Sequence, residues 1–422
     1  MKSAGLGLWV ALAALDSFAF KAVAQPSLDT TVSLRADAWS GDRQLNEKGA
    51  LAAASAWGRA NLDLGDAGQM IGQAWLRAAT REDGAPRGRV RELYLRREVG
   101  PVSLRVGRQL MAWGRADGLN PTDNLSPRDY TLLVPEDGDQ RRGSEAVSTV
   151  VHSDPNDFTV VWFPRAASHT LPLPETPGVQ FVVTRPPRQP QWALKWEGRA
   201  DGIDGSVSYF HGFDLMPDFT VGAPSAAGLN VVLRNQRTRV LGADLSVVRN
   251  DVVWRAEAAW SRTESAGPQD FQHKKPQLWL VAGGEWPFGE HTTAGLQLTA
   301  KRVIDFAAPE TAPSEIERAV AARQAATAGQ TARQQLGLVW RLAHRWQDDR
   351  LRAETSGVLI GPQRSGIARA QLDYALTDRL NLQVGVHLPF GAADTVFGQF
   401  ARNRLAFVQL RYGLEAEKVA LR

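Results

Sequence analysis

Apolar and polar residues alternate along most of the chain, which is the period of an extended strand. In residues 31–39, one face carries Val32, Leu34, Ala36 and Ala38, and the other face carries Ser33, Arg35, Asp37 and Trp39. The same alternation recurs to residue 412, and helical periodicity is nearly absent. The pattern predicts an all-β protein, although a soluble β-sandwich would alternate in the same way.

Strand length and loop rhythm separate these two architectures. Many alternating segments run for about 9–11 residues, the length of a tilted membrane-spanning strand, whereas soluble strands usually have about 5–6. We count about 18 candidate strands, with 16 as the alternative, and their connections alternate between short and long. Residues 65–68 and 377–379 are short connections, and residues 111–143 and 303–333 are long ones. We therefore predict one antiparallel up-and-down transmembrane β-barrel with short periplasmic turns and long extracellular loops.

Tryptophan placement fits the barrel. Trp254 and Trp260 bracket the apolar face of one candidate strand, about 20 Å apart at ~3.3 Å per residue. Tryptophan favours both membrane interfaces, so we expect these residues in two outer girdles. Trp39, Trp57 and Trp75 fall on the polar face, which points them into the barrel. One segment departs from the strand pattern: residues 313–330 have a helical composition after a possible Ser314 N-cap, and we expect a short helix on the outer rim.

The ends of the chain divide it into three parts. Residues 1–24 combine Lys2, an apolar stretch at 6–14 and a small-residue cleavage site at 22–24, as a secretory signal peptide does. We assign residues 25–414 to the barrel and residues 415–422 to a C-terminal tail, with Tyr412 as the terminal aromatic residue. Export through a signal peptide predicts a Gram-negative outer-membrane location.

Composition removes several functional classes. The 422 residues include no cysteine, which excludes disulfides, thiolate nucleophiles and cysteine-bound metals. A formal net charge of +4 is too small to indicate nucleic-acid binding. No metalloprotease or EF-hand spacing occurs, and Glu136, Asp137 and Asp139 are best explained as a solvated acidic turn. We expect no cofactor and no metal.

The polar faces carry more cations than anions, and a dry interior could not accommodate so many charges. An aqueous, mildly cation-lined lumen follows, with a weak preference for anions. The segment 106–143 is unusually long and rich in Gly, Asn-Pro and Asp, so we expect it to fold inward as a constriction rather than to form an outer lid. The candidate lumen and constriction residues are Arg35, Arg59, Arg77, Arg105, Arg108, Arg115, Asp117, Asn120, Asp123, Arg128, Asp129, Arg255, Glu257, Arg352 and Glu354.

Three motifs in residues 102–220 resemble a family of Gram-negative outer-membrane barrels often encoded beside RND-type exporters and a periplasmic carrier. They are Gly107-Arg108-Gln109 followed by Trp113-Gly114 and Asn120-Pro121-Thr122-Asp123, the segment 160–174, and the segment 206–219. Porin-like and alginate-exporter-like barrels share parts of this pattern. The resemblance implies an outer-membrane location, export of lipid-like or small hydrophobic cargo, partnership with an inner-membrane exporter and a carrier, and no catalytic residue.

These observations favour a channel or export-pathway component that is not an enzyme. The alternatives are an outer-membrane barrel enzyme, which needs a Ser–His–acid set, and a non-conducting barrel that binds a partner. Only His211, near Ser206, Ser208 and Asp214, offers a local grouping of that kind. Outer-membrane lipid is the one partner that every reading requires. The sequence leaves the oligomeric state, the cargo and the direction of flux open.

Overall fold

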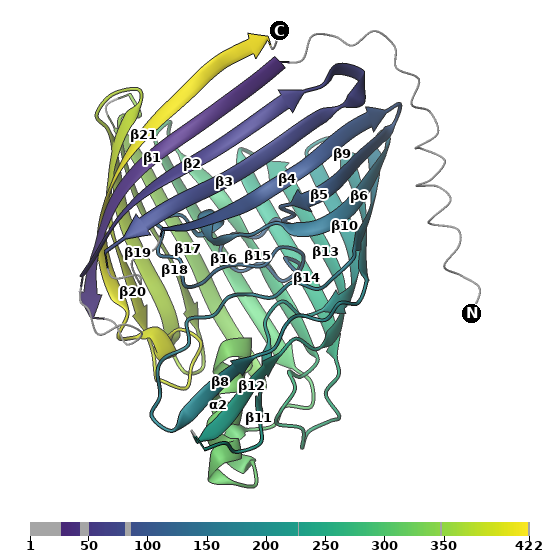
Figure 1. Cartoon of the computed structure of the whole chain (residues 1–422), viewed down its shortest axis with the longest axis vertical. Coiled ribbons are helices and arrows are strands. Elements are labelled where there is room, and N and C mark those ends of the chain that lie inside the picture. Colours follow the sequence, from purple (N-terminus) through teal and green to yellow (C-terminus); the bar gives the residue numbers. More distant parts are fainter. Residues whose placement is uncertain (1–26, 43–49, 81–85, 227, 347, 421–422) are drawn as a thin grey trace.

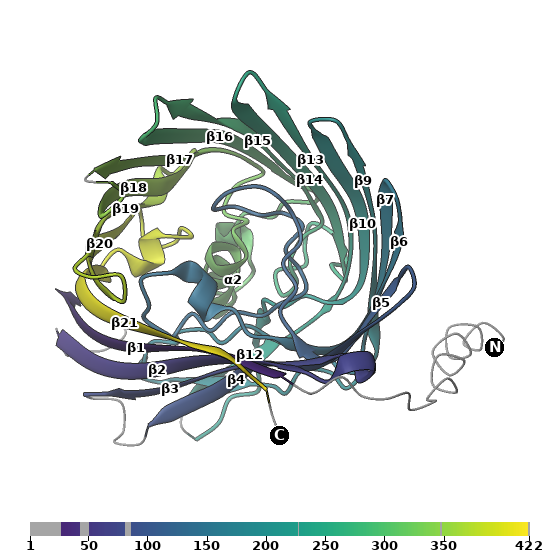
Figure 2. The ribbon, with the colours of Figure 1, turned by 90° about the horizontal axis from the view of Figure 1, so that it is seen from above.

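The computed structural model describes residues 27–42, 50–80, 86–226, 228–346 and 348–420. Within them, 18 strands form one closed antiparallel barrel, which confirms the predicted fold class and the larger strand count (Figures 1 and 2). The barrel strands are β1 (Ser27–Asp42), β2 (Ala50–Asp63), β3 (Gln69–Ala79), β4 (Arg87–Val99), β5 (Val102–Gln109), β6 (Ser144–Ser153), β7 (Asn156–Phe163), β9 (Gln191–Ala200), β10 (Ile203–Phe213), β13 (Arg237–Arg249), β14 (Val252–Thr263), β15 (Gln277–Phe288), β16 (Thr292–Val303), β17 (Gln334–Trp346), β18 (Leu351–Ile360), β19 (Ser365–Ala375), β20 (Leu380–Phe390) and β21 (Arg404–Ala420).

Pairing between the first and last strands closes the barrel. β1 pairs with β21 from Ser27 opposite Ala420 to Asp42 opposite Arg404. Each remaining barrel strand pairs with its barrel neighbours, and β7–β9 and β10–β13 bridge the two points where loop strands intervene in the sequence. Closure leaves no sheet edge unpaired, as a strand wall in a lipid bilayer requires.

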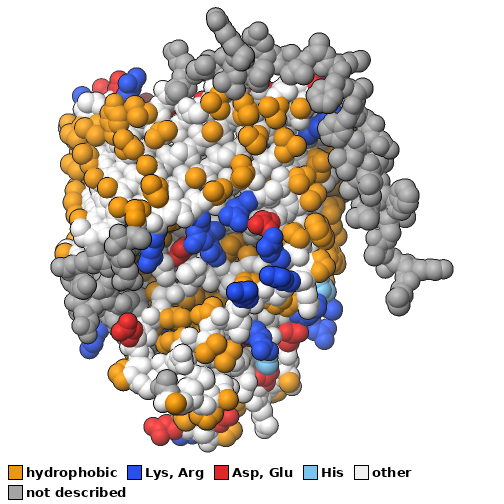
Figure 3. Space-filling model, in the orientation of Figure 1, with side chains coloured by type: hydrophobic (Ala, Val, Ile, Leu, Met, Phe, Trp, Pro, Cys, Tyr) orange, Lys and Arg blue, Asp and Glu red, His pale blue; other side chains and the backbone are white. Residues whose placement is uncertain are grey.

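The wall is apolar outside and polar inside, as the alternation predicts. Leu298, Leu336 and Leu76 point outward and are 66 %, 71 % and 54 % exposed. Trp254 and Trp260 also lie on this outer surface, 46 % and 41 % exposed. Orange side chains cover much of the upper wall in Figure 3. A surface this apolar is adapted to lipid rather than to water.

Connections at one end of the barrel are short and those at the other end are long. Asn250 and Asp251 form a two-residue turn between β13 and β14, both with positive φ (51° and 62°), the backbone of a type I′ hairpin. We call the end of the barrel that carries the short connections the short-turn end, and both described chain termini lie there (Figure 1). Among the described residues, no helix is both long and apolar enough to cross a membrane.

Two long loops contain structure that the sequence did not predict. β8 (Val179–Val183), β11 (Asp218–Val221) and β12 (Leu229–Arg234) form a three-stranded sheet at the long-loop end, with β8 parallel to β12.

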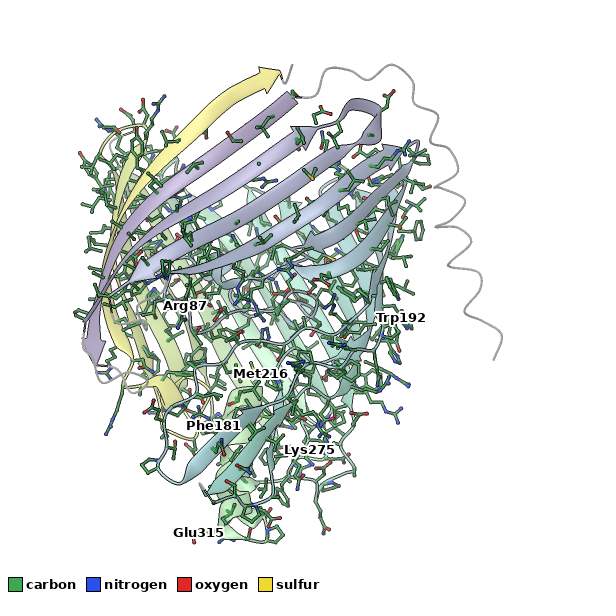
Figure 4. All side chains as sticks on the ribbon, in the orientation of Figure 1. Arg87, Phe181, Trp192, Met216, Lys275 and Glu315 are labelled. Carbon is green, nitrogen blue, oxygen red and sulfur yellow. The ribbon has the colours of Figure 1, made fainter. Side chains whose placement is uncertain are left out.

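α2 (Glu315–Ala328) begins at Ser314, which makes the expected N-cap as part of a capping box with Glu317. The helix packs against β11 and lies over the mouth of the barrel, not on its outer rim (Figures 2 and 4).

The C-terminal end also differs from expectation. We expected a tail from residue 415, but β21 continues to Ala420 and pairs with β1 throughout. The last residues therefore lengthen the final strand. The proposed signal peptide, residues 1–24, lies outside the described residues.

Candidate functional site

The segment between β5 and β6, residues 110–143, enters the barrel and crosses its lumen (Figure 2). We call it the inward loop. Its first arm places Met111 and Leu125 in a buried cluster with wall residues of β6, β7, β9, β10, β13 and β14. Its second arm places Leu132 and Val134 against the wall tryptophans Trp57 and Trp75. Eight strands separate β2 from β14 in either direction around the barrel, so the loop is attached to opposite walls.

A single wall carboxylate holds the tip of the first arm. Glu257 on β14 is 3 % exposed, and its Oε2 accepts the backbone N–H groups of Arg115 (3.0 Å) and Ala116 (3.1 Å). Its Oε1 accepts the backbone N–H of Thr122 (2.7 Å) and the Thr122 hydroxyl (2.8 Å). The side-chain amide of Asn120, with its nitrogen toward Glu257, lies 2.5 Å from Oε1 and 2.7 Å from Oε2. The loop thus forms a cradle around an anion supplied by the wall.

The Trp-Gly and Asn-Pro-Thr positions of the sequence motif build this cradle. Gly114 has a φ of +92°, and a Cβ there would lie 2.0 Å from the side-chain amide of Asn120 and 2.5 Å from Glu257 Oε2. Only glycine combines this backbone conformation with so close an approach. The motif is therefore explained by attachment of the loop to the wall.

Arg115 extends the attachment to two more wall carboxylates. Its Nε donates to Asp244 Oδ1 at 2.6 Å, and its Nη2 pairs with Glu197. Burial alone would lower the pKa of Arg115, but the hydrogen bond and charge of Asp244, together with Glu197, raise it. Asp117, two residues on, pairs with Arg255 on β14 at 3.0 Å.

The second arm reverses this arrangement, because here the loop supplies the acids and the wall supplies the arginines. Asp137 pairs with Arg369 on β19 at 2.5 Å, and Asp139 pairs with Arg35 on β1. Burial would raise the pKa of Asp137, but the charge and hydrogen bond of Arg369 outweigh it and lower the pKa. Our expectation of a merely solvated acidic turn was therefore wrong, because Asp137 and Asp139 pair with arginines of the wall.

Wall arginines also bind the loop backbone. Arg77 on β3 donates to the Leu133 carbonyl at 2.6 Å, and Arg91 on β4 donates to the Gly138 carbonyl at 2.7 Å. One side of the lumen thus offers carboxylates to loop N–H groups, and the other offers guanidinium groups to loop carbonyls and acids. This complementarity explains why a polar loop leaves solvent for the barrel interior.

A large cavity lies between the inward loop and the long-loop end. Its volume is about 1650 Å³, and its lining includes the inward loop, the inner wall and α2. Its lining combines apolar side chains, among them Leu132, Trp279 and Phe400, with cations such as Lys301 and with acids such as Glu354. We call this cavity, on the long-loop side of the inward loop, the vestibule.

The structure places all candidate residues except Arg108 in two groups. On inward strand positions lie Arg35, Arg59, Arg77, Arg105, Arg255, Glu257, Arg352 and Glu354. On the inward loop lie Arg115, Asp117, Asn120, Asp123, Arg128 and Asp129. Near the loop's base, Asp123 binds the guanidinium of Arg141 at 2.5 Å, and Asp129 lies 3.6 Å from Arg89.

The prediction that Arg108 lines the lumen is wrong, because this residue faces outward. It lies opposite Leu93, which is 51 % exposed, and it pairs with Glu145 on the outer surface at 3.1 Å. The alternation on β5 places Arg105 and Gly107 inside, so Arg108 has the opposite parity. The Gly-Arg-Gln motif runs directly into the inward loop, so the sequence alone associates Arg108 with the residues of that loop.

Sequence reasoning also missed residues that hold the loop. Arg91 enters the lumen because of a bulge in β4 opposite β3, between Gln73 and Ala74, which shifts the parity of the strand. Such a bulge leaves no clear mark in the hydrophobic pattern. Asp244, Glu197 and Arg369 occupy inward positions of the strand alternation, but nothing in the sequence links them to the loop.

The described residues do not assemble the two alternative chemistries considered from the sequence. Ser206 lies on the inner face and donates to Asp244, whereas His211 faces outward and stacks on Trp192. These side chains lie on opposite faces of β10, so they form no catalytic set. No group of three or more potential metal ligands occurs in the described part of the chain.

No family model and no curated protein matches the sequence. Similar folds occur among solved structures. OccAB1 of Acinetobacter baumannii has a TM-score of 0.57 at 8 % identity, over 92 % of this chain and 96 % of that one. OpdK of Pseudomonas aeruginosa, in its structure with vanillate, has a TM-score of 0.56 at 9 % identity, over 92 % and 99 %. OpdL of the same species has a TM-score of 0.55 at 10 % identity, over 92 % and 99 %. At these identities the likeness concerns the barrel fold.

Proposed function

We propose that this chain is an outer-membrane channel whose aqueous lumen is narrowed by the inward loop. The observation that carries the proposal is the combination of an apolar outer wall with a charged interior crossed by a wall-anchored loop. In this orientation the short-turn end faces the periplasm and the long-loop end faces outward. The fold similarity to the outer membrane protein OpdK supports the same location.

We also propose a preference for anions, set on the periplasmic side of the constriction. Arg59 on β2 and Arg105 on β5 point into the lumen there, and no carboxylate of the described residues lies within 4 Å of either guanidinium in an ion pair. By contrast, the acids Glu197, Asp244 and Glu257 opposite are occupied by the inward loop. Cations that remain unpaired in a water-filled pore raise the local concentration of anions.

The lining of the vestibule suggests the kind of solute. A cavity of about 1650 Å³ that combines apolar walls with basic and acidic side chains suits a small organic ion with an apolar part, and the unpaired Arg59 and Arg105 beyond it favour an anion. One barrel of similar fold was solved with vanillate. The motif resemblance adds an export route fed by an inner-membrane exporter and a periplasmic carrier; recovery of these proteins after cross-linking in cells would support that addition.

Conductance in planar bilayers tests the channel. We expect discrete conductance steps and, under a KCl gradient, a reversal potential of the sign for anion selectivity. The R59Q/R105Q variant should move that potential toward the value for a non-selective pore. The matched control for each of the single variants R59Q and R105Q is R302Q: Arg302 is an exposed arginine of β16 on the outer face, so its loss makes the same one-unit change in charge without changing the lumen. Absence of conductance from folded, reconstituted barrel would refute the proposal.

A further inference from the structure

A row of two aromatic and two cationic side chains crosses the outer surface of the barrel near the long-loop end. Register places Trp192 (β9), His211 (β10), Arg239 (β13) and Arg262 (β14) side by side on four adjacent strands. Arg239 and Arg262 are both exposed, and His211 stacks on Trp192 with ring centroids 5.6 Å apart. Figure 4 shows Trp192 on the outer side of the wall, at its right-hand edge.

The pairing of two arginines is unfavourable without a counter-ion. Directly opposed residues on antiparallel strands have Cβ atoms about 4.5–5.5 Å apart, and like charges in such pairs destabilise a sheet. Among the described residues, no carboxylate forms an ion pair with Arg239 or Arg262. The nearest acid on this edge by sequence, Glu264, accepts the backbone N–H of Arg237 instead.

Another part of the same rim shows how the fold neutralises outward arginines. On β6, Glu145 lies between Arg108 (3.1 Å) and Arg165 (2.7 Å) and bridges them. No equivalent acid stands between Arg239 and Arg262 in the described structure. Neutralisation of these two arginines is therefore left to water or to an anion from outside the chain.

The row lies at the boundary between the apolar wall and the polar rim. Two residues closer to the middle of each strand, on the same outer face, lie Tyr209 on β10, Leu241 on β13 and Trp260 on β14. Leu241 and Trp260 are 48 % and 41 % exposed. Further along β13, Leu245 is 43 % exposed on the same face. An anion bound here would therefore have an apolar surface directly beside it.

We propose that Arg239 and Arg262, with His211 beside them, bind a phosphate group of an outer-leaflet lipid. Guanidinium groups bind phosphate oxygens in pairs, and two adjacent arginines can hold one phosphate from both sides. The acyl chains of the same lipid would lie along Tyr209, Leu241 and Trp260. This apolar surface favours a lipid phosphate over free phosphate, which could not use it. The inference depends on outer-membrane location but not on conductance.

Retention of lipid by the purified full-length barrel tests the site. Wild-type protein, R239Q/R262Q and the control R249Q/R379Q are incubated with vesicles containing bis-phosphorylated lipid A, re-extracted in detergent and examined by native mass spectrometry. The control removes two exposed arginines from the short-turn end, so its change in charge is the same. A heat-modifiable gel shift establishes that each barrel is folded.

We expect wild-type and control proteins to retain lipid A, and R239Q/R262Q to retain at least about fivefold less. The conservative R239K/R262K should recover part of the binding, because lysine keeps the charge but not the paired geometry. Equal retention by R239Q/R262Q and wild type would overturn the proposal. Displacement of lipid A by millimolar inorganic phosphate would overturn it too, because the site would then bind phosphate without the lipid. Conductance should be unchanged, which separates this test from that of the channel.

Discussion

Replacing Glu257 by glutamine tests whether one wall carboxylate keeps the inward loop in the constriction. The side chain retains its length and its Oε1 acceptor, but an NH2 group replaces one oxygen. That group faces donors in either orientation: the N–H groups of Arg115 and Ala116, or the backbone N–H of Thr122 and the side-chain amide of Asn120. Glu257→Gln therefore removes two hydrogen bonds and places donors against donors.

The magnitude follows from these contacts. Hydrogen bonds to a charged acceptor contribute about 1.5–3 kcal/mol each, so two lost bonds amount to about 3–6 kcal/mol. Water in the lumen can satisfy the freed N–H groups of the loop, which reduces the net cost to about 2–4 kcal/mol. Every 1.4 kcal/mol is a factor of ten in an equilibrium, so opening of this arm should increase by roughly 30-fold or more.

Hydrogen exchange and single-channel recording measure this opening. In Glu257→Gln, the backbone amides of Arg115, Ala116 and Thr122 should exchange at least tenfold faster, and the conductance should rise and become noisier. The matched control is Glu354→Gln, which removes the same charge from the lumen but contacts only Arg341 and Arg352 on the wall. Unchanged exchange in Glu257→Gln, or an equal effect in the control, would refute the reasoning.

Three further predictions concern the inward loop and the structured segments at the long-loop end. Gly114→Ala should raise conductance as Glu257→Gln does, because its Cβ would meet Asn120 at 2.0 Å; normal conductance of the folded variant would contradict the cradle. Burial lowers the pKa of His169 to about 3. The loop that carries His169 is therefore fully docked above about pH 6.5, where the histidine is neutral whether docked or free. Docking should weaken as the pH falls from about 6.5 to about 3, because the free histidine takes up a proton and the buried one does not. Proteolysis of that loop against pH should show the change, and His169→Gln should flatten it. Asp218 is 1 % exposed, accepts a hydrogen bond from Gln324 of α2 (2.8 Å) and lies 3.5 Å from Lys274 Nζ. Asp218→Ala should therefore lower the local stability of the α2 region by about 3 kcal/mol. Proteolytic cleavage within α2 should become faster while the barrel stays intact.

Alternation and loop length predict the barrel because both are local consequences of a wall with two faces. A strand position reports its own side of the wall, so Trp57 and Trp75 could be assigned to the interior and Trp254 and Trp260 to the exterior. The prediction fails where the parity changes or ends. Arg91 enters the lumen through a bulge, and Arg108 lies at the last outward position before the loop.

Partners that are distant in sequence could not be predicted in the same way. Glu257 lies 135 positions after Thr122, and Asp137 lies 232 positions before Arg369. The residue types of the cradle, a glycine and an Asn-Pro-Thr turn, indicated an ordered loop, but not the anion that it surrounds. The parallel pairing of β8 with β12 joins two separate loops, and neither loop contains a pattern that identifies the other.

The two attachments of the inward loop should respond differently to salt. The first arm is held by backbone N–H groups on Glu257, which is 3 % exposed, whereas the second depends partly on the pair of Arg369 and Asp137, with side chains 30 % and 46 % exposed. Raising ionic strength from 0.1 to 1 M shortens the Debye length from about 10 to about 3 Å, which weakens exposed pairs and affects buried hydrogen bonds little.

Amides around Asp137 should therefore exchange several-fold faster at 1 M KCl, while those of Arg115 and Thr122 keep their rates. Asp137→Asn should remove most of the salt dependence of the second arm, since the pair of Asp139 with Arg35 that remains has side chains only 16 % and 7 % exposed and is little screened. If both arms loosened together, the loop would open as one unit, and the separation of the two attachments would be wrong. If instead they respond separately, the second arm can move in salt while the Glu257 cradle still holds the constriction in the pore.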